Sequence, residues 1–195
     1  MAASHKQRML AGELYSGQDP ELMAGHLRAR RLMDRFNASL ADEEALRRDL
    51  LRELFAAFGE GAVVRPPFHC DYGSNISIGR GTFANYGCVM LDCNTITIGE
   101  DVQIGPAVQI YTPDHPLDAE TRRSGLESAR PVSIGNNAWL GGGAIVCPGV
   151  TIGADTVVGA GSVVVRDLPP GVVAVGNPCR VLRALPDRPA PHHSP

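Results

Sequence analysis

Aliphatic residues recur at every sixth position between residues 134 and 164, and this period limits the fold more than any other feature of the chain. Glycine follows four of the six aliphatic residues, which are Ile134, Leu140, Val146, Ile152, Val158 and Val164. A hexapeptide period of this kind predicts a parallel β-helix, in which each hexad supplies one short strand and one turn. The aliphatic side chains are expected to point inward and stack along the axis. The glycines are expected to relieve crowding at the corners and to adopt left-handed backbone angles there.

Earlier hexads extend the same pattern toward the N-terminus. They place Ile78, Ala84, Met90 and Ile96 six residues apart, and the series then restarts two residues later at Ile98. We interpret this slip as one longer corner that bulges outward. A sandwich of short β-hairpins is the alternative fold, but hairpin strands vary in length and do not keep a six-residue register.

Residues 1–60 have the pattern of a helical segment. Asp19-Pro20 predicts a helix start, with Asp as N-cap and Pro at the first helical position. Residues 39–42 resemble a capping box for a second helix with an apolar stripe. That stripe comprises Leu46, Leu50, Leu54 and Phe58.

The remaining chain divides into a solenoid, a loop and a tail. Residues 61–185 are expected to form the β-helix, interrupted by a polar loop over residues 111–133 that contains three prolines. A long loop inside a compact repeat is commonly functional. Residues 186–195 are Pro-rich and are expected to be disordered. The expected fold is therefore mainly β: a left-handed parallel β-helix with an N-terminal helical segment and a protruding loop.

Composition excludes several functional classes. The net charge of -3 argues against nucleic acid as a partner. The five cysteines form no C-x-x-C pair, which favours reduced thiols. The chain has no signal-peptide pattern and no apolar run of about 20 residues, so we expect a cytoplasmic protein without a membrane span. The six histidines do not offer three solenoid positions for a metal, so no metal site is expected.

One histidine, His115, lies in the loop that interrupts the solenoid. Prolines stand close on both sides of it and stiffen the backbone. Histidine titrates near neutral pH, so one held on a rigid loop is a candidate general base. Asp71, Asp92 and Glu127 are candidate acidic partners. A solvent-exposed histidine without a catalytic role is the alternative.

Several motifs together resemble the maltose and galactoside O-acetyltransferases. The resemblance extends over roughly residues 7–185 and includes the opening segment Met9-Leu-Ala-Gly-Glu-Leu-Tyr15. The other motifs are Tyr72-Gly-Ser-Asn-Ile-x-Ile-Gly79, Ala84-Asn-Tyr86, Asp114-His-Pro116, Ile134-Gly-Asn-Asn-x-Trp139, Pro148-Gly-Val-Thr-Ile-Gly153 and Asn177-Pro-Cys-Arg-Val-Leu-Arg183.

The resemblance implies an acetyl-CoA-dependent homotrimer with sites between neighbouring solenoids. His115 would take a proton from a hydroxyl, the 6-OH, of a sugar such as maltose, glucose or a galactoside, and the acetyl group would transfer directly. The acceptor-binding positions that it implies are Asp19, Asp71, Asn85, Asp92 and Glu127. The CoA-binding positions are Trp139, Gly142, Ala160, Val165, Arg166, Arg180 and Arg183.

Departures from the family pattern leave the acceptor open. Galactoside enzymes carry an acidic residue where this chain has Cys93, and Gly142 and Val165 replace a serine and a threonine of some relatives. Trp139 fits packing at a subunit interface as well as a CoA channel, and Arg166 fits a solvated surface charge. Alternative functions are acetylation of a xenobiotic or a nodulation-factor-like oligosaccharide, or a catalytically silent β-helix that serves as a binding module.

Overall fold

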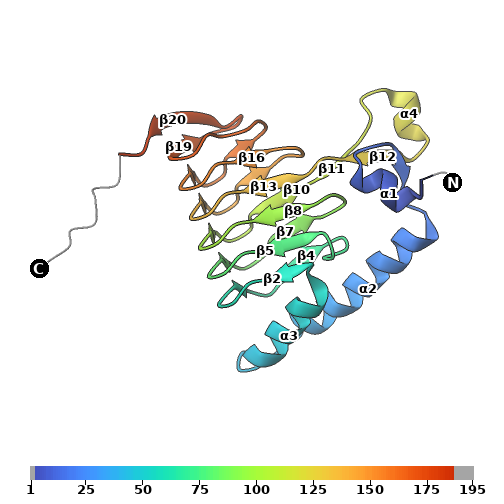
Figure 1. The fold of residues 1–195 in the computed structure, drawn as a ribbon, viewed down its shortest axis with the longest axis horizontal. Helices are drawn as coiled ribbons and strands as arrows, with labels where there is room; N and C mark the ends of the chain where they lie inside the picture. The colour runs from blue at the N-terminus through green and yellow to red at the C-terminus, as the bar shows by residue number, and fades with distance from the viewer. Residues whose placement is uncertain (1–2, 187–195) are drawn as a thin grey trace, which may run out of the picture.

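A column of stacked coils forms the body of the molecule, and helices cover one side of it (Figure 1). The computed structural model describes residues 3–186. The helices are α1 (His5–Leu10), α2 (Pro20–Asn37), α3 (Glu44–Leu54) and α4 (Ala119–Arg123). None of the described helices is long and apolar enough to cross a membrane.

Three sheets make the three sides of the column, and the strands within each side run parallel. One side contains β4 (Phe68–Cys70), β7 (Cys88–Leu91), β10 (Gln109–Tyr111), β15 (Ile145–Val146) and β18 (Val163–Val164). The second contains β2 (Ala57–Phe58), β5 (Ile76–Ile78), β8 (Ile96–Ile98), β13 (Val132–Ile134) and β16 (Thr151–Ile152). The third contains β3 (Val63–Val64), β6 (Phe83–Ala84), β9 (Gln103–Ile104), β14 (Trp139–Leu140), β17 (Val157–Val158) and β19 (Val172–Val175), with β20 (Arg180–Ala184) added antiparallel at its end. The predicted parallel β-helix is confirmed.

The coil length changes along the axis, as the register slip predicts. Ile78 pairs with Ile98, twenty residues later, whereas Ile134 pairs with Ile152, eighteen residues later. These aliphatic side chains are buried and form the core. The longer coils place their two additional residues in one corner.

That longer corner does not bulge into solvent, so this part of the expectation is wrong. Asp92, Cys93 and Asn94 are all at most 5% exposed. The Asn94 side-chain amide donates to the carbonyl oxygens of Met9 (3.1 Å) and Ala129 (3.0 Å). The corner is covered because the N-terminal segment and the last part of the 111–133 stretch, which contains Ala129, dock on it.

The hexad glycines are required for space, whereas left-handed angles occur elsewhere. A Cβ atom on Gly135 would lie 2.4 Å from the backbone nitrogen of Ala154 in the next coil, and Gly135 is not among the residues with positive φ. Gly143 has a φ of +69° and open space around its Cβ position. Non-glycine residues such as Asp101 also adopt positive φ. Close stacking of backbones therefore explains the Ile-Gly repeat.

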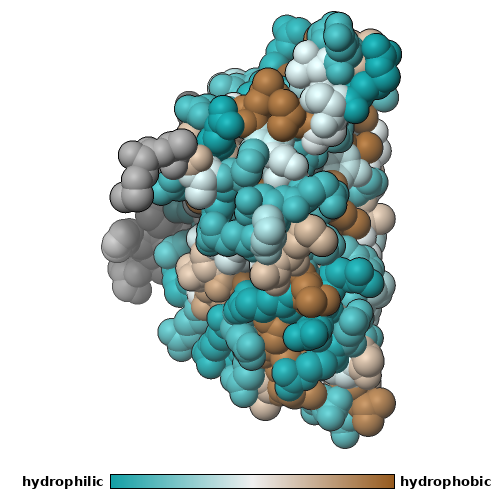
Figure 2. All heavy atoms as spheres, turned by 90° about the vertical axis from the view of Figure 1, so that its right-hand side faces the viewer, coloured by the Kyte–Doolittle hydropathy of each residue, from teal (hydrophilic) through white to brown (hydrophobic). Residues whose placement is uncertain are grey.

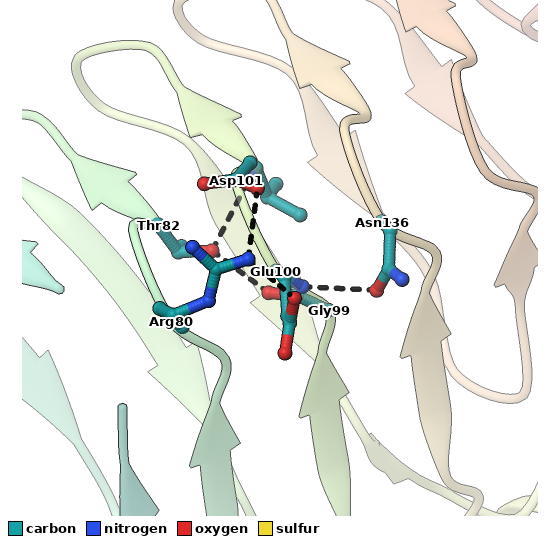
Figure 3. Close-up of polar contacts among 7 residues, drawn as sticks. Arg80, Thr82, Gly99, Glu100, Asp101 and Asn136 are labelled. Atoms are coloured by element: carbon teal, nitrogen blue, oxygen red, sulfur yellow. Dashed lines mark hydrogen bonds and ion pairs between the residues drawn. The ribbon is translucent and has the colours of Figure 1, made fainter. Parts of the chain in front are cut away.

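Polar side chains link successive coils along one corner (Figure 3). The Thr82 hydroxyl donates to the Gly99 carbonyl oxygen (2.7 Å), and Asn136 accepts a hydrogen bond from the Glu100 N–H (2.9 Å). Arg80 forms an exposed ion pair with Glu100 (3.0 Å). The contacts of Thr82 and Asn136 pair backbone groups at the turns.

The N-terminal helices follow the sequence only in part. Asp19 caps α2 by accepting from the Glu21 N–H (3.0 Å), as predicted. The predicted capping box at residues 39–42 is wrong, because α3 begins at Glu44 without a side-chain cap. Phe58 belongs to β2, in the first coil, and does not extend the apolar stripe of α3.

The far end of the column is closed by the β19–β20 hairpin. Residues 187–195 of the predicted disordered tail lie outside the described residues.

We predict that Gly135→Ala destabilises the protein much more than Gly143→Ala. The first change drives a methyl group into the next coil's backbone, which we expect to cost about 3 kcal/mol or more. The second adds only backbone strain, about 1 kcal/mol. Thermal unfolding of both variants at one protein concentration measures the difference. Equal melting temperatures would contradict the steric account.

Candidate active site

The stretch predicted as a protruding loop is an arm with its own small sheet. It contains β11 (Pro113–Asp114), α4 and β12 (Leu126–Ala129), and β12 pairs antiparallel with both β11 and β1 (Tyr15–Ser16). In Figure 1 the arm stands out beside α1 at the upper right of the column. This sheet joins the arm to the N-terminal segment and fixes the backbone on both sides of α4.

A pocket of about 740 Å³ lies where the arm, α2 and the longer corner meet. Three of the predicted site residues line it: Asp71, His115 and Glu127. The other lining residues are Gly17, Gln18, Met23, Ala24, His26, Leu27, Arg30, Tyr72, Leu91, Cys93 and Pro113. A second hollow of about 870 Å³ lies between α3 and β3, and no predicted site residue lines it.

His115 follows β11 directly and projects at the mouth of this pocket. Its side chain is 66% exposed, and its Nε2 atom lies 3.9 Å from a carboxylate oxygen of Glu127, which is 21% exposed. The preceding residue, Asp114, pairs with Arg130 at 3.0 Å. A histidine that is accessible and adjacent to a carboxylate is suited to proton transfer.

Asp71 also lines the pocket. The Cys93 thiol donates to its carboxylate at 3.4 Å. Burial raises the pKa of Asp71, while the Cys93 hydrogen bond and nearby His26 oppose that shift. His26 also makes an edge contact with Tyr72, with 6.2 Å between ring centroids. His26 therefore packs against Tyr72 and also lines the pocket.

Asp92 is a structural residue in this chain and does not line the pocket. Its carboxylate is fully buried and accepts hydrogen bonds from the backbone N–H groups of Asp71 (3.1 Å), Tyr72 (2.8 Å) and Asn75 (3.1 Å). Burial raises the pKa of Asp92 to about 6, although the hydrogen bonds from backbone N–H groups favour the ionised form. Acceptor binding by Asp92 stays a prediction, and within this chain its oxygens are engaged by the backbone N–H groups of the corner.

Two further predicted acceptor residues lie outside the pocket lining. Asp19 caps α2, next to Gln18 in the wall. Asn85 lies beyond β6, where its side-chain oxygen accepts from the Tyr86 N–H (2.9 Å).

The predicted CoA-binding residues lie on the column, away from this pocket. Gly142 and Ala160 occupy the same corner in successive coils, because Gly161, next to Ala160, donates its N–H to the Gly142 carbonyl oxygen (3.0 Å). Trp139 on β14 is 55% exposed and Val165 is 45% exposed. Arg166 follows β18, and exposed Arg180 and Arg183 lie on β20.

Sequence reasoning missed the part of the pocket that α2 supplies. Met23, Leu27 and Arg30 follow a helical spacing on one face, and the two apolar residues are 53% and 48% exposed. Figure 2 views the side that carries α1, α2 and α4, and shows a mainly hydrophilic surface broken by small hydrophobic patches. An apolar residue pair on the face opposite the buried stripe was the available signal.

Comparison with known proteins supports the family resemblance that the sequence motifs indicate. Residues 8–59 match the maltose acetyltransferase hexapeptide capping motif, and residues 131–166 match the bacterial transferase hexapeptide model of six repeats. Nodulation protein L of Rhizobium meliloti is 54% identical over 93% of this chain and 99% of its own length. The chain belongs to the maltose and galactoside O-acetyltransferase family.

Solved structures of this family superpose closely on the chain. A maltose O-acetyltransferase from Clostridium difficile 630 is 47% identical, with a TM-score of 0.94 over 96% of this chain and all of that one. A galactoside acetyltransferase in complex with coenzyme A is 43% identical, with a TM-score of 0.93 over 96% of this chain and 94% of that one. The chain is thus an acyltransferase. Within residues 3–186, no cluster of three or more His, Cys, Asp or Glu side chains could hold a metal ion.

We predict that Asp92→Ala lowers stability because it leaves three backbone N–H groups of the corner without their acceptor. The expected loss is about 2–4 kcal/mol, since buried donors without partners are costly. This corresponds to roughly 4–16 °C in melting temperature for a chain of this size. Asp49→Ala, an exposed carboxylate on α3, is the control and should change little. An unchanged melting temperature for Asp92→Ala would contradict the structural role.

Proposed function

We propose that this protein transfers an acetyl group from acetyl-CoA to a hydroxyl group of a sugar, with His115 as general base. The observation that carries the proposal is the position of His115 at the mouth of a pocket lined by carboxylates, 3.9 Å from Glu127. The coenzyme A bound to the related galactoside acetyltransferase supports acetyl-CoA as the donor.

The chemistry is a direct transfer within a complex of both substrates. Glu127 lies nearest to Nε2 of His115, so Nδ1 is the nitrogen that we assign to the acceptor. As Nδ1 takes the hydroxyl proton, the oxygen attacks the thioester carbonyl carbon. The C–S bond then breaks, and the CoA thiolate leaves and takes up the proton. Glu127 stabilises the imidazolium that forms in between, and a base of this kind contributes about 10²–10⁴-fold to the rate.

The walls of the pocket support a sugar as the acceptor, with the 6-OH of maltose, glucose or a galactoside as the reacting group. The carboxylates of Asp71 and Glu127 accept hydrogen bonds from hydroxyl groups. Tyr72, Met23 and Leu27 offer apolar surface to the C–H faces of a sugar ring. This combination of polar and apolar groups is typical of small-molecule sites.

A homotrimer would bring together predicted site residues that lie apart from His115 within a single chain. Asn85 and Trp139 lie outside the pocket that contains His115. Val63 and Trp139 are exposed on β3 and β14 of one sheet, which gives that side of the column an apolar surface. We assign this side to a neighbouring copy, so that its Asn85 meets His115 and the predicted CoA residues line the cleft between the two columns.

An oligosaccharide of the nodulation-factor type is the second candidate acceptor. The high identity to nodulation protein L favours it, and a pocket of about 740 Å³ that opens to solvent leaves room beyond one sugar ring. Thiol release from acetyl-CoA with a panel of maltose, glucose, galactosides, chitin oligomers, chloramphenicol and serine separates the candidates. A silent binding module would release no thiol with any of them.

We predict that His115→Ala lowers kcat by at least about 100-fold, because the acceptor hydroxyl then lacks its base. The KM for acetyl-CoA should stay near normal. His69→Ala, an exposed histidine on β4, is the matched control and should keep full activity. Retained activity of the His115 variant would remove the general-base assignment.

Asp71→Asn should weaken acceptor binding while it leaves the donor site intact. We expect the acceptor KM to rise about tenfold, since one charged hydrogen-bond acceptor is lost. Initial rates at varied acceptor and fixed acetyl-CoA concentration provide the measurement. An unchanged acceptor KM would place the acceptor elsewhere.

A further inference from the structure

The hydroxyl of Tyr15 is buried without a hydrogen-bond partner. Tyr15 is 0% exposed, and its hydroxyl is the one buried side-chain polar atom within residues 3–186 that lacks a partner. Leaving such a group unpaired costs about 1–3 kcal/mol. Phenylalanine would fill the same space without that cost, so the hydroxyl calls for an explanation beyond packing.

The sheet of the arm places Tyr15 beside the pocket. Tyr15 on β1 is directly opposite Glu127 on β12 in the antiparallel register. Side chains of directly opposed residues lie on the same face of a sheet and within contact distance. Burial, together with neighbouring Cys93 and Glu127, raises the pKa of Tyr15, so its phenol stays protonated and available as a donor.

Glu127 is the better acceptor of the two neighbours. A thiol sulfur accepts hydrogen bonds weakly, and Cys93 already donates its proton to Asp71. A carboxylate accepts strongly, and a hydrogen bond to it is about twice as strong as one between neutral groups. The Glu127 carboxylate lies against Gly17, where an added Cβ atom would be 3.1 Å from its oxygen, so the glycine leaves room for this carboxylate.

We propose that Tyr15 is a positioning residue, whose hydroxyl donates to the Glu127 carboxylate and holds it against His115 in the working enzyme. This inference rests on the proposed function. Because the Tyr15 hydroxyl is buried, it does not touch the acceptor and acts through Glu127. Glu127 is partly exposed and lies between the two, 3.9 Å from His115. A carboxylate fixed in this place keeps the imidazole oriented and stabilises its protonated form during transfer.

The test uses the full-length Tyr15→Phe and Glu127→Gln variants and their combination. We expect Tyr15→Phe to lower kcat about tenfold, the scale of one lost charge-assisted hydrogen bond. The KM for acetyl-CoA should stay within about twofold of normal, because the predicted CoA residues lie elsewhere. The double variant should be no slower than Glu127→Gln alone, because both changes interrupt one interaction.

The proposal is overturned by either of two results. A normal kcat in Tyr15→Phe, or losses that multiply in the double variant, would each indicate that the hydroxyl does not act through Glu127. Tyr111→Phe, which removes a hydroxyl bonded to Gln109, is the matched control and should keep normal kcat. If His115→Ala is inactive while Tyr15→Phe is normal, only this inference fails. If His115→Ala retains activity, the proposed function itself fails.

Discussion

The buried side chain of Asn94 connects three parts of the chain that are far apart in sequence, and the pocket depends on this connection. Its amide donates to the carbonyl oxygens of Met9, Leu10 and Ala129, while its own N–H donates to the Thr112 hydroxyl. Each of these groups is a backbone or hydroxyl group, and leaving it buried without a hydrogen-bond partner would cost free energy. The N-terminal segment, the arm and the corner are thereby fixed on one another. The pocket that His115 lines is the space left between them.

The sequence predicts the column of coils well, because the residue pattern that produces each coil is local and recurs along the chain. A coil has to bury one aliphatic residue per side, and the backbones of successive coils approach so closely that the next position often accepts only glycine, as at Gly135. Such a rule recurs every six residues and is visible without a structure. The helix start at Asp19 is equally local. The predicted capping box failed because Ser39 instead donates to the Phe36 carbonyl at the end of α2.

The sequence predicted the longer corner as an insertion, but it wrongly placed that corner in solvent. Its two additional residues could be counted, yet nothing local indicates what covers them. Asp92 illustrates the difficulty: a carboxylate near a candidate base suggests substrate binding, but its oxygens pair with three backbone N–H groups of the preceding coil's corner. Only the coil stacking brings these groups together.

Part of the lining of the candidate site was predicted from the sequence. His115 stood out because it lies in the loop that interrupts the hexapeptide repeat. Asp71 and Glu127, its candidate acidic partners, line the same pocket. Tyr15 gave no signal, because its pairing with Glu127 joins residues that are more than a hundred positions apart. Asn85 and the CoA-binding positions remain predictions, since within one chain they lie apart from His115.

The most direct test of the central claim is a crystal structure of the protein with coenzyme A and an acceptor sugar bound together. The account predicts a sugar hydroxyl in the pocket between α2, the corner and the arm, about 3 Å from a ring nitrogen of His115. A sugar bound in another place, with no hydroxyl near that imidazole, would contradict it.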